Sequence, residues 1–547
     1  MASKAPRFAI GVDYGTNSVR ALVVDIADGT EIATHVYDYP SGDAGILLDP
    51  KDPHLARQSP KDYIEGFITS VRRAVQKAKK VDGFSPEAVV GIGIDTTGST
   101  PIPVDREGIP LAVKPEFEGN LAAQAWLWKD HTGFAEAAEI TEKAGKVKDN
   151  YLSKCGGTYS SEWYWSKILH CKRSTPAVFQ AAYSWVELAD FIPGYVTGNT
   201  DPHTIPRGIC AAGHKAMYND GWKGLPAKAF LNRLDPELGE LRDRYASQAL
   251  TSDQKAGDLT ADIAKKVGLP PGVPVAVGAF DAHMGAVGAG IKPGTLVKII
   301  GTSTCDMMVH PLDQPLADIP GLCGIVPGSI IPNMYGLEAG QSAVGDIFNW
   351  FVKYLAPAEY TRQGDPHVNL SQAAEKLQPG ESGLLALDWN NGNRTILVDP
   401  LLSGLLVGQT LHTTAPEIYR TLVEATAFGA LTIIKRFEEY GVPVKEVVNC
   451  GGIAEKNPFV MQIYADVCNR PMKISRSAQT CALGAAIFGA VAGGAYKSTE
   501  QAQRKMTGTK PTVYKPNRQA VKVYEQLYEL YRSLHDGFGG VADSAKL

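Results

Sequence analysis

The sequence predicts an α/β protein built from two large, related domains, on three observations. The chain has 547 residues, which exceeds the size at which a single hydrophobic core keeps growing. Strand-like apolar runs alternate with amphipathic helical runs through both halves, as is typical of α/β layers. The halves also share one local pattern. We expect domains of residues 7–290 and 291–547, with the boundary near the Gly-rich stretch 285–294, where regular pattern thins out.

One helix is predicted residue by residue, from Pro60 onward. Ser59 is a candidate N-cap, and proline suits the first helical position. Apolar side chains then recur at the spacing of one helical face, at Ile64, Phe67, Ile68, Val71 and Val75. This stripe predicts ordinary core packing and indicates no function.

The pattern that the two halves share is a β-hairpin with a Gly-Thr turn. The first hairpin joins the apolar runs 8–12 and 21–24, and the second joins 296–300 and 307–309. The first turn comprises Gly15, Thr16 and Asn17, and the second turn comprises Gly301, Thr302 and Ser303. If the two halves are related domains that face each other, both turns point into one cleft.

Both turns are candidate phosphate-binding elements. Glycine lets backbone N–H groups approach a phosphate closely because it has no Cβ, and the neighbouring Thr, Asn and Ser add short donors. Asp13, just before the first turn, could hold Mg²⁺ directly or through water. A single Gly-Thr turn is most often only a turn. Two of the same form, one of them beside a carboxylate, favour binding of ATP·Mg²⁺ from two sides.

Composition argues against several other classes of protein. A formal net charge of −4 provides no extended positive field for nucleic acid, so a small ligand is expected. The eight cysteines form no Cys-x-x-Cys pair and no cluster at zinc spacing, which favours reduced thiols. Residues 1–7 lack an apolar secretory core, and the apolar run 481–492 is short and rich in Gly and Ala. We therefore expect a cytoplasmic protein with no membrane partner; the oligomeric state stays open, with a homodimer as one option.

Three motifs resemble those of the FGGY family of carbohydrate kinases. Residues 10–18 look like that family's opening phosphate motif, residues 277–286 like its catalytic-base motif, and residues 449–459 like its adenosine motif. The likeness runs from about residue 8 to about residue 494, in the family's order. It implies the two-domain, ribonuclease H-like fold of actin, hexokinase and the heat-shock chaperones, with ATP and sugar in the interdomain cleft.

The resemblance also implies a general base and a sugar pocket. Asp281 would accept the proton of the sugar hydroxyl, although an Asp there could instead cap the following helix. Lys215 and Glu338 would bind sugar oxygens, and Gly98 would contribute its backbone. Without the resemblance, a solvated surface charge is the more ordinary interpretation of Lys215 and Glu338. His283 receives no role, because phosphoryl transfer to an alcohol does not require it.

For the nucleotide, the resemblance implies that Gly451, Gly452 and Asn457 contact adenosine. The two glycines would let the backbone lie against the base and the ribose. Asn457 precedes a proline, so it could cap the next helix, bind nucleotide, or do both.

Four further stretches most resemble the family members that phosphorylate L-ribulose: residues 95–100, 157–163, 211–217 and 336–342. The resemblance therefore implies ATP and Mg²⁺ as cofactors, transfer to the C5 hydroxyl of a ketopentose, and a place in L-arabinose catabolism. Two alternatives stay open. One is a family kinase for another sugar or polyol, such as D-ribulose or xylulose. The other is a non-enzymatic ATP switch of the actin or chaperone kind.

Overall fold

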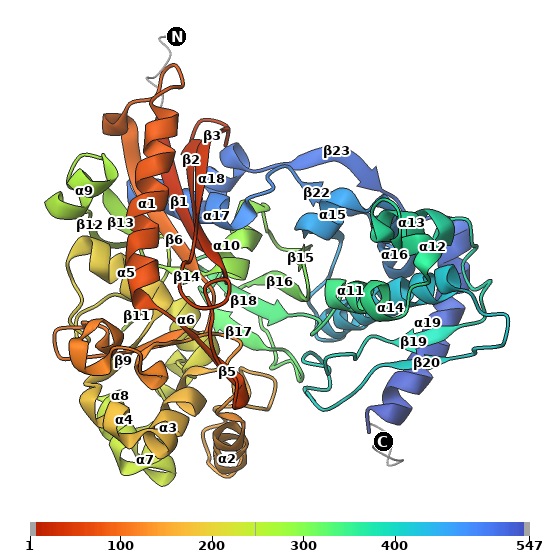
Figure 1. The fold of residues 1–547 in the computed structure, drawn as a ribbon, viewed down its shortest axis with the longest axis horizontal. Helices are drawn as coiled ribbons and strands as arrows, with labels where there is room; N and C mark the ends of the chain where they lie inside the picture. Colours follow the sequence, from red (N-terminus) through yellow and green to blue (C-terminus); the bar gives the residue numbers. More distant parts are fainter. Residues whose placement is uncertain (1–6, 247, 541–547) are drawn as a thin grey trace. The chain divides into compact units, whose positions relative to one another are not determined.

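A computed structural model describes residues 7–246 and 248–540. The chain packs as two compact units, coloured along the sequence in Figure 1. The first unit comprises residues up to 290 together with 324–336 and 479–508, and the second comprises 291–323, 337–478 and the residues from 509 onward. Two segments of the later half thus belong to the first unit, so each unit is built from several stretches of chain.

The first unit contains a mixed main sheet. Its strands are β1 (Phe8–Tyr14), β2 (Ser18–Asp25), β3 (Glu31–Asp38), β6 (Val89–Thr96), β12 (Lys255–Asp258), β13 (Pro274–Ala276) and β14 (Ala279–Phe280). The order is β12-β13-β6-β1-β2-β3, with β14 beside the end of β6. Strand β1 is antiparallel to β2 and parallel to β6, and β13 is parallel to β6. The predicted first hairpin is therefore confirmed.

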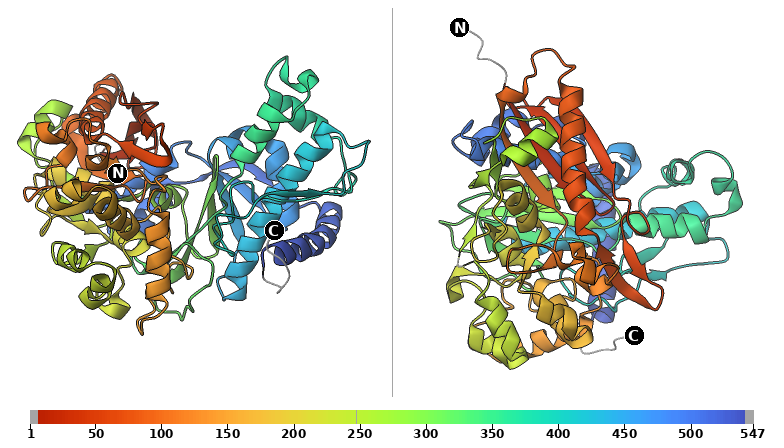
Figure 2. Two further views of the ribbon diagram at one scale, coloured as in Figure 1. Left: turned by 60° about the horizontal axis from the view of Figure 1, so that its bottom comes forward. Right: turned by 60° about the vertical axis from the view of Figure 1, so that its left-hand side comes forward.

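Helices cover both faces of this sheet. Helix α1 (Pro60–Ala78) packs on β2 and β3, along which the right-hand view of Figure 2 shows it running. It begins after Ser59, as predicted, and buries Phe67, Val71 and Val75. The opposite face meets α17 (Thr480–Ala492), which lies against β1 and β6 and packs on α10 (Asp281–Gly288).

Small residues explain how closely α17 approaches. A Cβ at Gly93 in β6 would lie 1.8 Å from the carbonyl oxygen of Ala485. A Cβ at Gly288 in α10 would lie 2.0 Å from the carbonyl oxygen of Thr480. The Gly- and Ala-rich run 481–492 is thus a tightly packed helix, as expected. The expectation that regular structure thins out over 285–294 is wrong for its first part, because these glycines serve helix packing.

The remaining elements of the first unit surround this sheet. Its short strands are β4 (Leu47–Asp49), β5 (Asp52–Gln58), β7 (Pro101–Val104), β8 (Ala125–Trp126), β9 (Ser184–Glu187), β10 (Arg207–Gly208), β11 (Ala249–Leu250) and β17 (Gly324–Pro327). Its other α-helices are α2 (Phe134–Ala144), α3 (Tyr164–Ser174), α4 (Pro176–Ala181), α5 (Leu188–Thr197), α6 (Ile209–Lys215), α7 (Lys228–Leu234), α8 (Pro236–Arg242), α9 (Ala261–Val267) and α18 (Thr499–Met506).

The second unit repeats the same sheet topology. Its main strands are β15 (Thr295–Ile300), β16 (Thr304–Pro311), β18 (Met334–Ala339, which enters this unit at residue 337), β21 (Glu446–Cys450), β22 (Met472–Ser475) and β23 (Thr509–Tyr514). They follow the order β18-β16-β15-β21-β22-β23. Strand β15 is antiparallel to β16 and parallel to β21, as β1 is to β2 and β6. The second hairpin, and with it the relation between the two halves, is confirmed.

Seven helices and a two-stranded sheet complete the second unit. They are α11 (Gly345–Tyr354), α12 (Ala358–Thr361), α13 (Pro366–Ala374), α14 (Ala415–Glu439), α15 (Gly452–Lys456), α16 (Pro458–Cys468), α19 (Arg518–Phe538), β19 (Leu385–Leu387) and β20 (Leu405–Val407), all counted within the described residues. Helix α16 packs on β22 and β23, with α14 and α19 against it.

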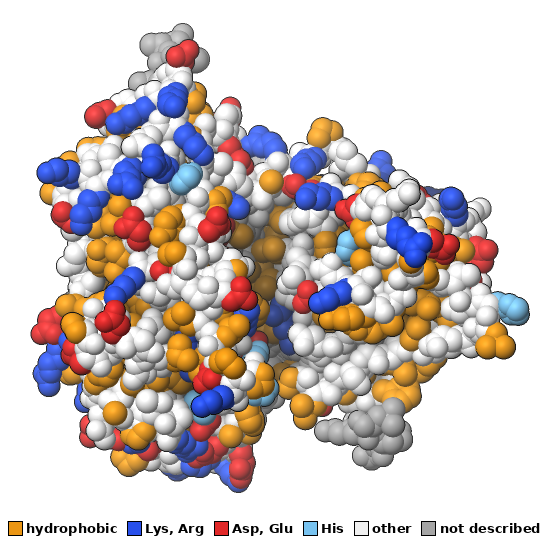
Figure 3. Space-filling view, in the orientation of Figure 1, with side chains coloured by type: hydrophobic (Ala, Val, Ile, Leu, Met, Phe, Trp, Pro, Cys, Tyr) orange, Lys and Arg blue, Asp and Glu red, His pale blue; other side chains and the backbone are white. Residues whose placement is uncertain are grey.

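The surface carries charges of both signs. On the face drawn in Figure 3, Lys and Arg side chains are intermingled with Asp and Glu. Within the described residues, none of the helices combines the length and the apolar character needed to cross a membrane.

Candidate active site

Three carboxylates lie where parallel strands of the first unit end. Asp13 near the end of β1 is the register partner of Asp95 in β6, and Asp95 is in turn the partner of Ala279 in β14. Asp281 follows β14 directly, as the first residue of α10. Side chains at the carboxyl ends of adjacent parallel strands meet at one edge of the sheet, where ligands of α/β folds bind. The topology thus brings Asp13 and Asp281 to the same sheet edge as Asp95, for which no role was predicted.

Asp95 has a strongly raised pKa in this cluster. Its side chain is fully buried, and burial, followed by the charges of Asp13 and Asp281, raises its pKa well above the usual range for Asp. Burial also raises the pKa of Asp13, while its hydrogen bond with Asp95 and the nearby Arg20 act in the other direction. The two neighbouring carboxyl groups thus disfavour a negative charge on both at once.

The cluster also fits a divalent cation. Within the described residues, no N–H or hydroxyl group donates to the buried oxygens of Asp95. Mg²⁺ takes oxygen ligands such as carboxylates, and a cation bound here would offset the charges that raise the pKa of Asp95. Asp13 and Asp95 are therefore the side chains that could hold Mg²⁺.

The first turn is held in place by its neighbours. The backbone N–H of Gly15 donates to the carbonyl oxygen of Ser18 at 2.9 Å. The hydroxyl oxygen of Thr16 accepts a hydrogen bond from the indole N–H of Trp128 at 3.0 Å. The side-chain amide of Asn17 donates to the carbonyl oxygen of Ala44 at 2.6 Å. The Thr16 hydroxyl keeps its own proton for another acceptor, whereas the Asn17 amide already has a structural partner.

The predicted sugar residues of the first unit share Phe280 as a neighbour. The Nζ atom of Lys215, at the end of α6, lies 5.6 Å from the centre of the Phe280 ring and 5.3 Å from that of Trp163. A Cβ at Gly98 would lie 2.0 Å from the Phe280 ring, so only glycine fits there. Asp281 is the next residue in the chain. Gly98, Lys215 and Asp281 are thus brought together, and Lys215 is 5% exposed, not solvated. Glu338 is a buried residue of β18 in the second unit.

The loop after β6, which carries Gly98, is fixed by two buried charged side chains. Lys167 donates to the carbonyl oxygen of Ser99 at 2.8 Å. Glu187 accepts the backbone N–H of Thr100 at 2.7 Å and the hydroxyl of Ser99. Burial raises the pKa of Glu187 to about 7 and lowers that of Lys167 to about 7. Because these hydrogen bonds hold the loop in place, its backbone needs little rearrangement to contact a ligand.

The second turn is anchored by the start of α11. The backbone N–H groups of Val344 and Asp346 donate to the carbonyl oxygen of Thr302, at 2.8 and 3.1 Å. The N–H of Gly345 donates to the carbonyl oxygen of Gly301 at 3.1 Å. These bonds tie the turn to a helix end, so its backbone has little freedom.

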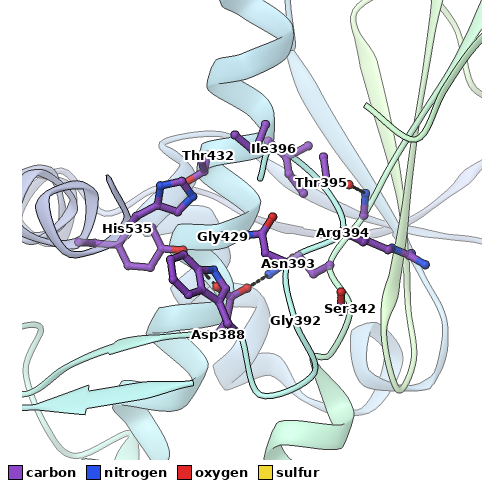
Figure 4. A pocket seen from close by; sticks show the side chains of 15 residues that line it. Ser342, Asp388, Gly392, Asn393, Arg394, Thr395, Ile396, Gly429, Thr432 and His535 are labelled. Atoms are coloured by element: carbon purple, nitrogen blue, oxygen red, sulfur yellow. Dashed lines mark hydrogen bonds between the residues drawn. The ribbon is translucent and has the colours of Figure 1, made fainter. Parts of the chain in front are cut away.

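A buried ion pair lies in the hairpin that carries the second turn. Lys298 in β15 donates to both carboxylate oxygens of Asp306 in β16, at 2.8 and 2.9 Å, and to the side-chain oxygen of Gln341 at 2.9 Å. The Gln341 amide donates to Asp388 at 2.7 Å, and the hydroxyl of Tyr531 in α19 donates to the other Asp388 oxygen at 3.1 Å. Figure 4 shows the Asp388 end of this network, in a pocket beside Asn393 and His535.

The adenosine motif joins β21 to two short helical segments. Gly451 has a φ of +95°, and a Cβ there would lie 2.4 Å from the carbonyl oxygen of Ile300, just before the second turn. Gly452 opens α15. Asn457 caps α16: its side-chain oxygen accepts the N–H of Val460 at 3.2 Å, and its amide donates to the Ser371 hydroxyl at 3.1 Å. The capping role is confirmed, while nucleotide contact stays a prediction.

Five charged residues around the predicted site residues received no role from the sequence alone: Asp95, Lys167, Glu187, Lys298 and Asp306. A signal was present for the last two, because a lone charge in an otherwise apolar buried strand needs a buried partner. Residues 295–300 read TLVKII, and 304–309 read TCDMMV.

Comparison with known proteins matches both halves of the chain to family models. Residues 8–288 match the N-terminal domain of the FGGY family of carbohydrate kinases, and residues 296–493 match its C-terminal domain. A protein of Shouchella clausii named ribulokinase is 42% identical, with 97% of this chain and 95% of that protein covered. A ribulokinase of Vibrio parahaemolyticus is also 42% identical, covering 98% and 96%, and one of Mycolicibacterium smegmatis is 41% identical, covering 98% and 94%.

Solved structures show the same fold. A xylulose kinase of Rhodospirillum rubrum superposes with a TM-score of 0.79 at 22% identity, covering 98% of this chain and 99% of the other. A ligand-bound xylulose kinase of Lactobacillus acidophilus gives 0.80 at 19% identity, with 97% and 98% covered. At these identities the likeness concerns the fold alone.

Proposed function

The chain belongs to the FGGY family of carbohydrate kinases, and from that premise we propose that it transfers the γ-phosphoryl group of ATP to the C5 hydroxyl of L-ribulose. The observation that carries the proposal is the arrangement of Asp281, Lys215 and Gly98 around Phe280. These residues offer a carboxylate, an amine and an uncovered backbone, which suit a polyol. The relatives that cover nearly the whole chain at 41–42% identity are named ribulokinase, which favours ribulose over xylulose or glycerol.

In the proposed reaction Asp281 accepts the proton of the attacking hydroxyl. General-base catalysis of this kind contributes about 10²- to 10⁴-fold to the rate. Lys215 donates to a sugar oxygen, Glu338 accepts from a sugar hydroxyl, and the backbone at Gly98 completes the pocket. A wrong sugar leaves one of these buried groups unpaired, which costs about 1–3 kcal/mol each.

We assign sugar binding, the first turn and the base to the domain of residues 7–290. The domain of residues 291–547 would hold the second turn and the adenosine contacts of Gly451, Gly452 and Asn457. Asp13 and Asp95 would hold Mg²⁺, which when bound neutralises phosphate charge. Thr16, Thr302 and Ser303 contribute hydroxyl donors for the phosphates, Asn17 contributes the amide N–H that does not donate to Ala44, and Gly15 and Gly301 contribute space. We further propose a cytoplasmic location, where ATP is abundant.

The turn glycines provide one prediction. Packing of the protein does not require glycine at either position. An added Cβ would come no closer than 3.5 Å to another residue at Gly15 and 4.0 Å at Gly301. We expect Gly15→Ala and Gly301→Ala to fold normally but to bind ATP·Mg²⁺ about tenfold more weakly, because the methyl group occupies phosphate space.

Calorimetric titration with a non-hydrolysable ATP analogue measures this effect. Gly537→Ala is a suitable control, since a Cβ there also meets no neighbour but the residue lies in α19. Unchanged affinity in both turn variants would remove the two glycines from the phosphate site.

The test of the proposed function is a substrate panel. Purified protein with ATP·Mg²⁺ is assayed for ADP release with L-ribulose, D-ribulose, both xyluloses, glycerol and no sugar. We expect turnover that depends on sugar and is fastest with L-ribulose. Preference for another sugar would keep the chemistry and replace the substrate. Turnover that ignores every sugar would favour the ATP switch of the actin or chaperone kind.

A further inference from the structure

Two buried histidines of the first unit meet beside the proposed base. His214 is the penultimate residue of α6 and His283 the third residue of α10, and the two are 1% and 2% exposed. Their Nε2 atoms lie 3.0 Å apart, and their ring centres 4.5 Å apart. The phosphoryl transfer proposed above uses neither imidazole. A direct contact between two buried imidazoles therefore calls for another explanation.

The pair also contacts Ser329, in the segment that carries β17. The Ser329 hydroxyl donates to the carbonyl oxygen of Val326 at 3.1 Å, so its oxygen is free to accept. The Nε2 atom of His214 lies 3.0 Å from that oxygen. The His214–His283 contact joins two ring nitrogens, so it is a hydrogen bond in which one of the two Nε2 atoms carries the proton and the other accepts it.

This contact connects the two helix ends that carry the proposed sugar residues. Lys215 follows His214 directly, and Asp281 precedes His283 by two residues in the first turn of α10. The Phe280 ring packs edge-on against His283 at 6.0 Å between centres and lies under the Lys215 amine. The contact thus fixes the distance between α6 and α10 at the point where both helices reach the proposed site.

The surroundings leave His214 little room to move. A Cβ at Gly324 would lie 1.9 Å from the Nδ1 atom of His214, so the backbone of β17 lies directly against the ring. At the end of α6, the hydroxyl of Tyr159 donates to the carbonyl oxygen of Lys215 at 2.5 Å. Because α6 is fixed in this way, the His214–His283 hydrogen bond holds α10 at a set distance from α6.

We propose that His214 and His283 are positioning residues: their hydrogen bond sets the distance between the sugar-binding Lys215 and the base Asp281. This inference rests on the proposed function, because it presumes that both neighbours act on the sugar. A misplacement of about 1 Å between such groups can cost on the order of 10²-fold in rate.

Two substitutions of His283 separate positioning from packing. His283→Phe keeps a ring of similar size and removes the nitrogen, whereas His283→Gln carries an amide atom near the position of Nε2. We expect His283→Phe to lower kcat/KM for L-ribulose about 10²-fold with binding of an ATP analogue within about twofold of wild type. We expect His283→Gln to recover about tenfold of that loss. In a double-mutant cycle, His214→Phe added to His283→Phe should cost little more.

Three results would overturn the proposal: His283→Phe as active as wild type, His283→Gln no better than His283→Phe, or a loss of analogue binding that parallels the loss of activity. The assay uses the sugar that wild type turns over fastest, so a change of substrate leaves the test intact. Nitrogen-15 spectra of the histidines give a readout without turnover, with a hydrogen bond between the ring nitrogens of His214 and His283 expected in wild type and lost in His283→Phe. Wild type inactive with every sugar, while this hydrogen bond is present, would reject the proposed function and the positioning role with it.

Discussion

Asp281→Asn should lower kcat by about 10²- to 10⁴-fold and leave the affinity for ATP·Mg²⁺ nearly unchanged. The amide has the shape of the carboxylate but cannot accept a proton from a sugar hydroxyl at neutral pH. Asp281 stands at the start of α10, and one of its oxygens accepts the N–H of Ala282 at 2.6 Å. Nucleotide binding depends on other residues of the proposed site, so it should survive the substitution.

The alternative that Asp281 only stabilises the start of α10 is testable in the same assay. Asp281→Ser keeps a side-chain oxygen that can accept backbone N–H groups, as helix-terminal serines do, but provides no base. Asp262→Asn is a matched control, because Asp262 is also in the first turn of a helix, α9, and its side chain is 72% exposed. Substantial turnover by Asp281→Ser would show that the residue acts through the helix and not as the base.

Lys298→Met should cost about 3–5 kcal/mol in the stability of the second unit. The substitution leaves Asp306 as a buried charge with no cation, since Lys298 and Asp306 are 1% and 0% exposed. It also removes the donor to Gln341, through which the pair connects to Asp388 and α19. The hairpin that carries the second turn should therefore loosen first.

Hydrogen exchange of the β15 and β16 amides measures this loss locally, which matters because a chain of two units need not unfold in one step. Lys298→Met/Asp306→Leu is the control, because replacing both members of a buried pair by apolar groups is often neutral. We expect the double variant to regain most of the protection. A double variant as unstable as the single one would mean that Lys298 acts by its packing and not by its charge.

The parts of the fold that the sequence predicted are those encoded locally. The two Gly-Thr hairpins and helix α1 follow from runs of apolar residues and turn residues that are adjacent in the chain. The return of residues 479–508 to the first unit could not be predicted, because it depends on contacts between α17 and strands more than 380 residues earlier. The glycines of α10 looked like a loop for the same reason, since their partner α17 is remote.

The candidate site also contains residues that can be recognised locally and residues whose role depends on remote contacts. Asp13, Asp281 and the turn residues lie in motifs that can be recognised along the chain. Asp95 gains its significance only from the register that places it beside Asp13. Lys167 and Glu187 come from separate elements and both contact the loop that carries Gly98, so their spacing in the sequence does not predict their role.

The most direct test of the central claim is where the γ-phosphoryl group of ATP goes. Phosphorus-31 NMR of a reaction with ATP·Mg²⁺ and L-ribulose distinguishes a sugar phosphate from inorganic phosphate, and proton correlation assigns the carbon that carries it. We expect one sugar phosphate per ADP, with the phosphate at C5 and little inorganic phosphate. ADP accompanied by an equal amount of inorganic phosphate, at a rate independent of the sugar, would contradict a sugar kinase that acts through Asp281.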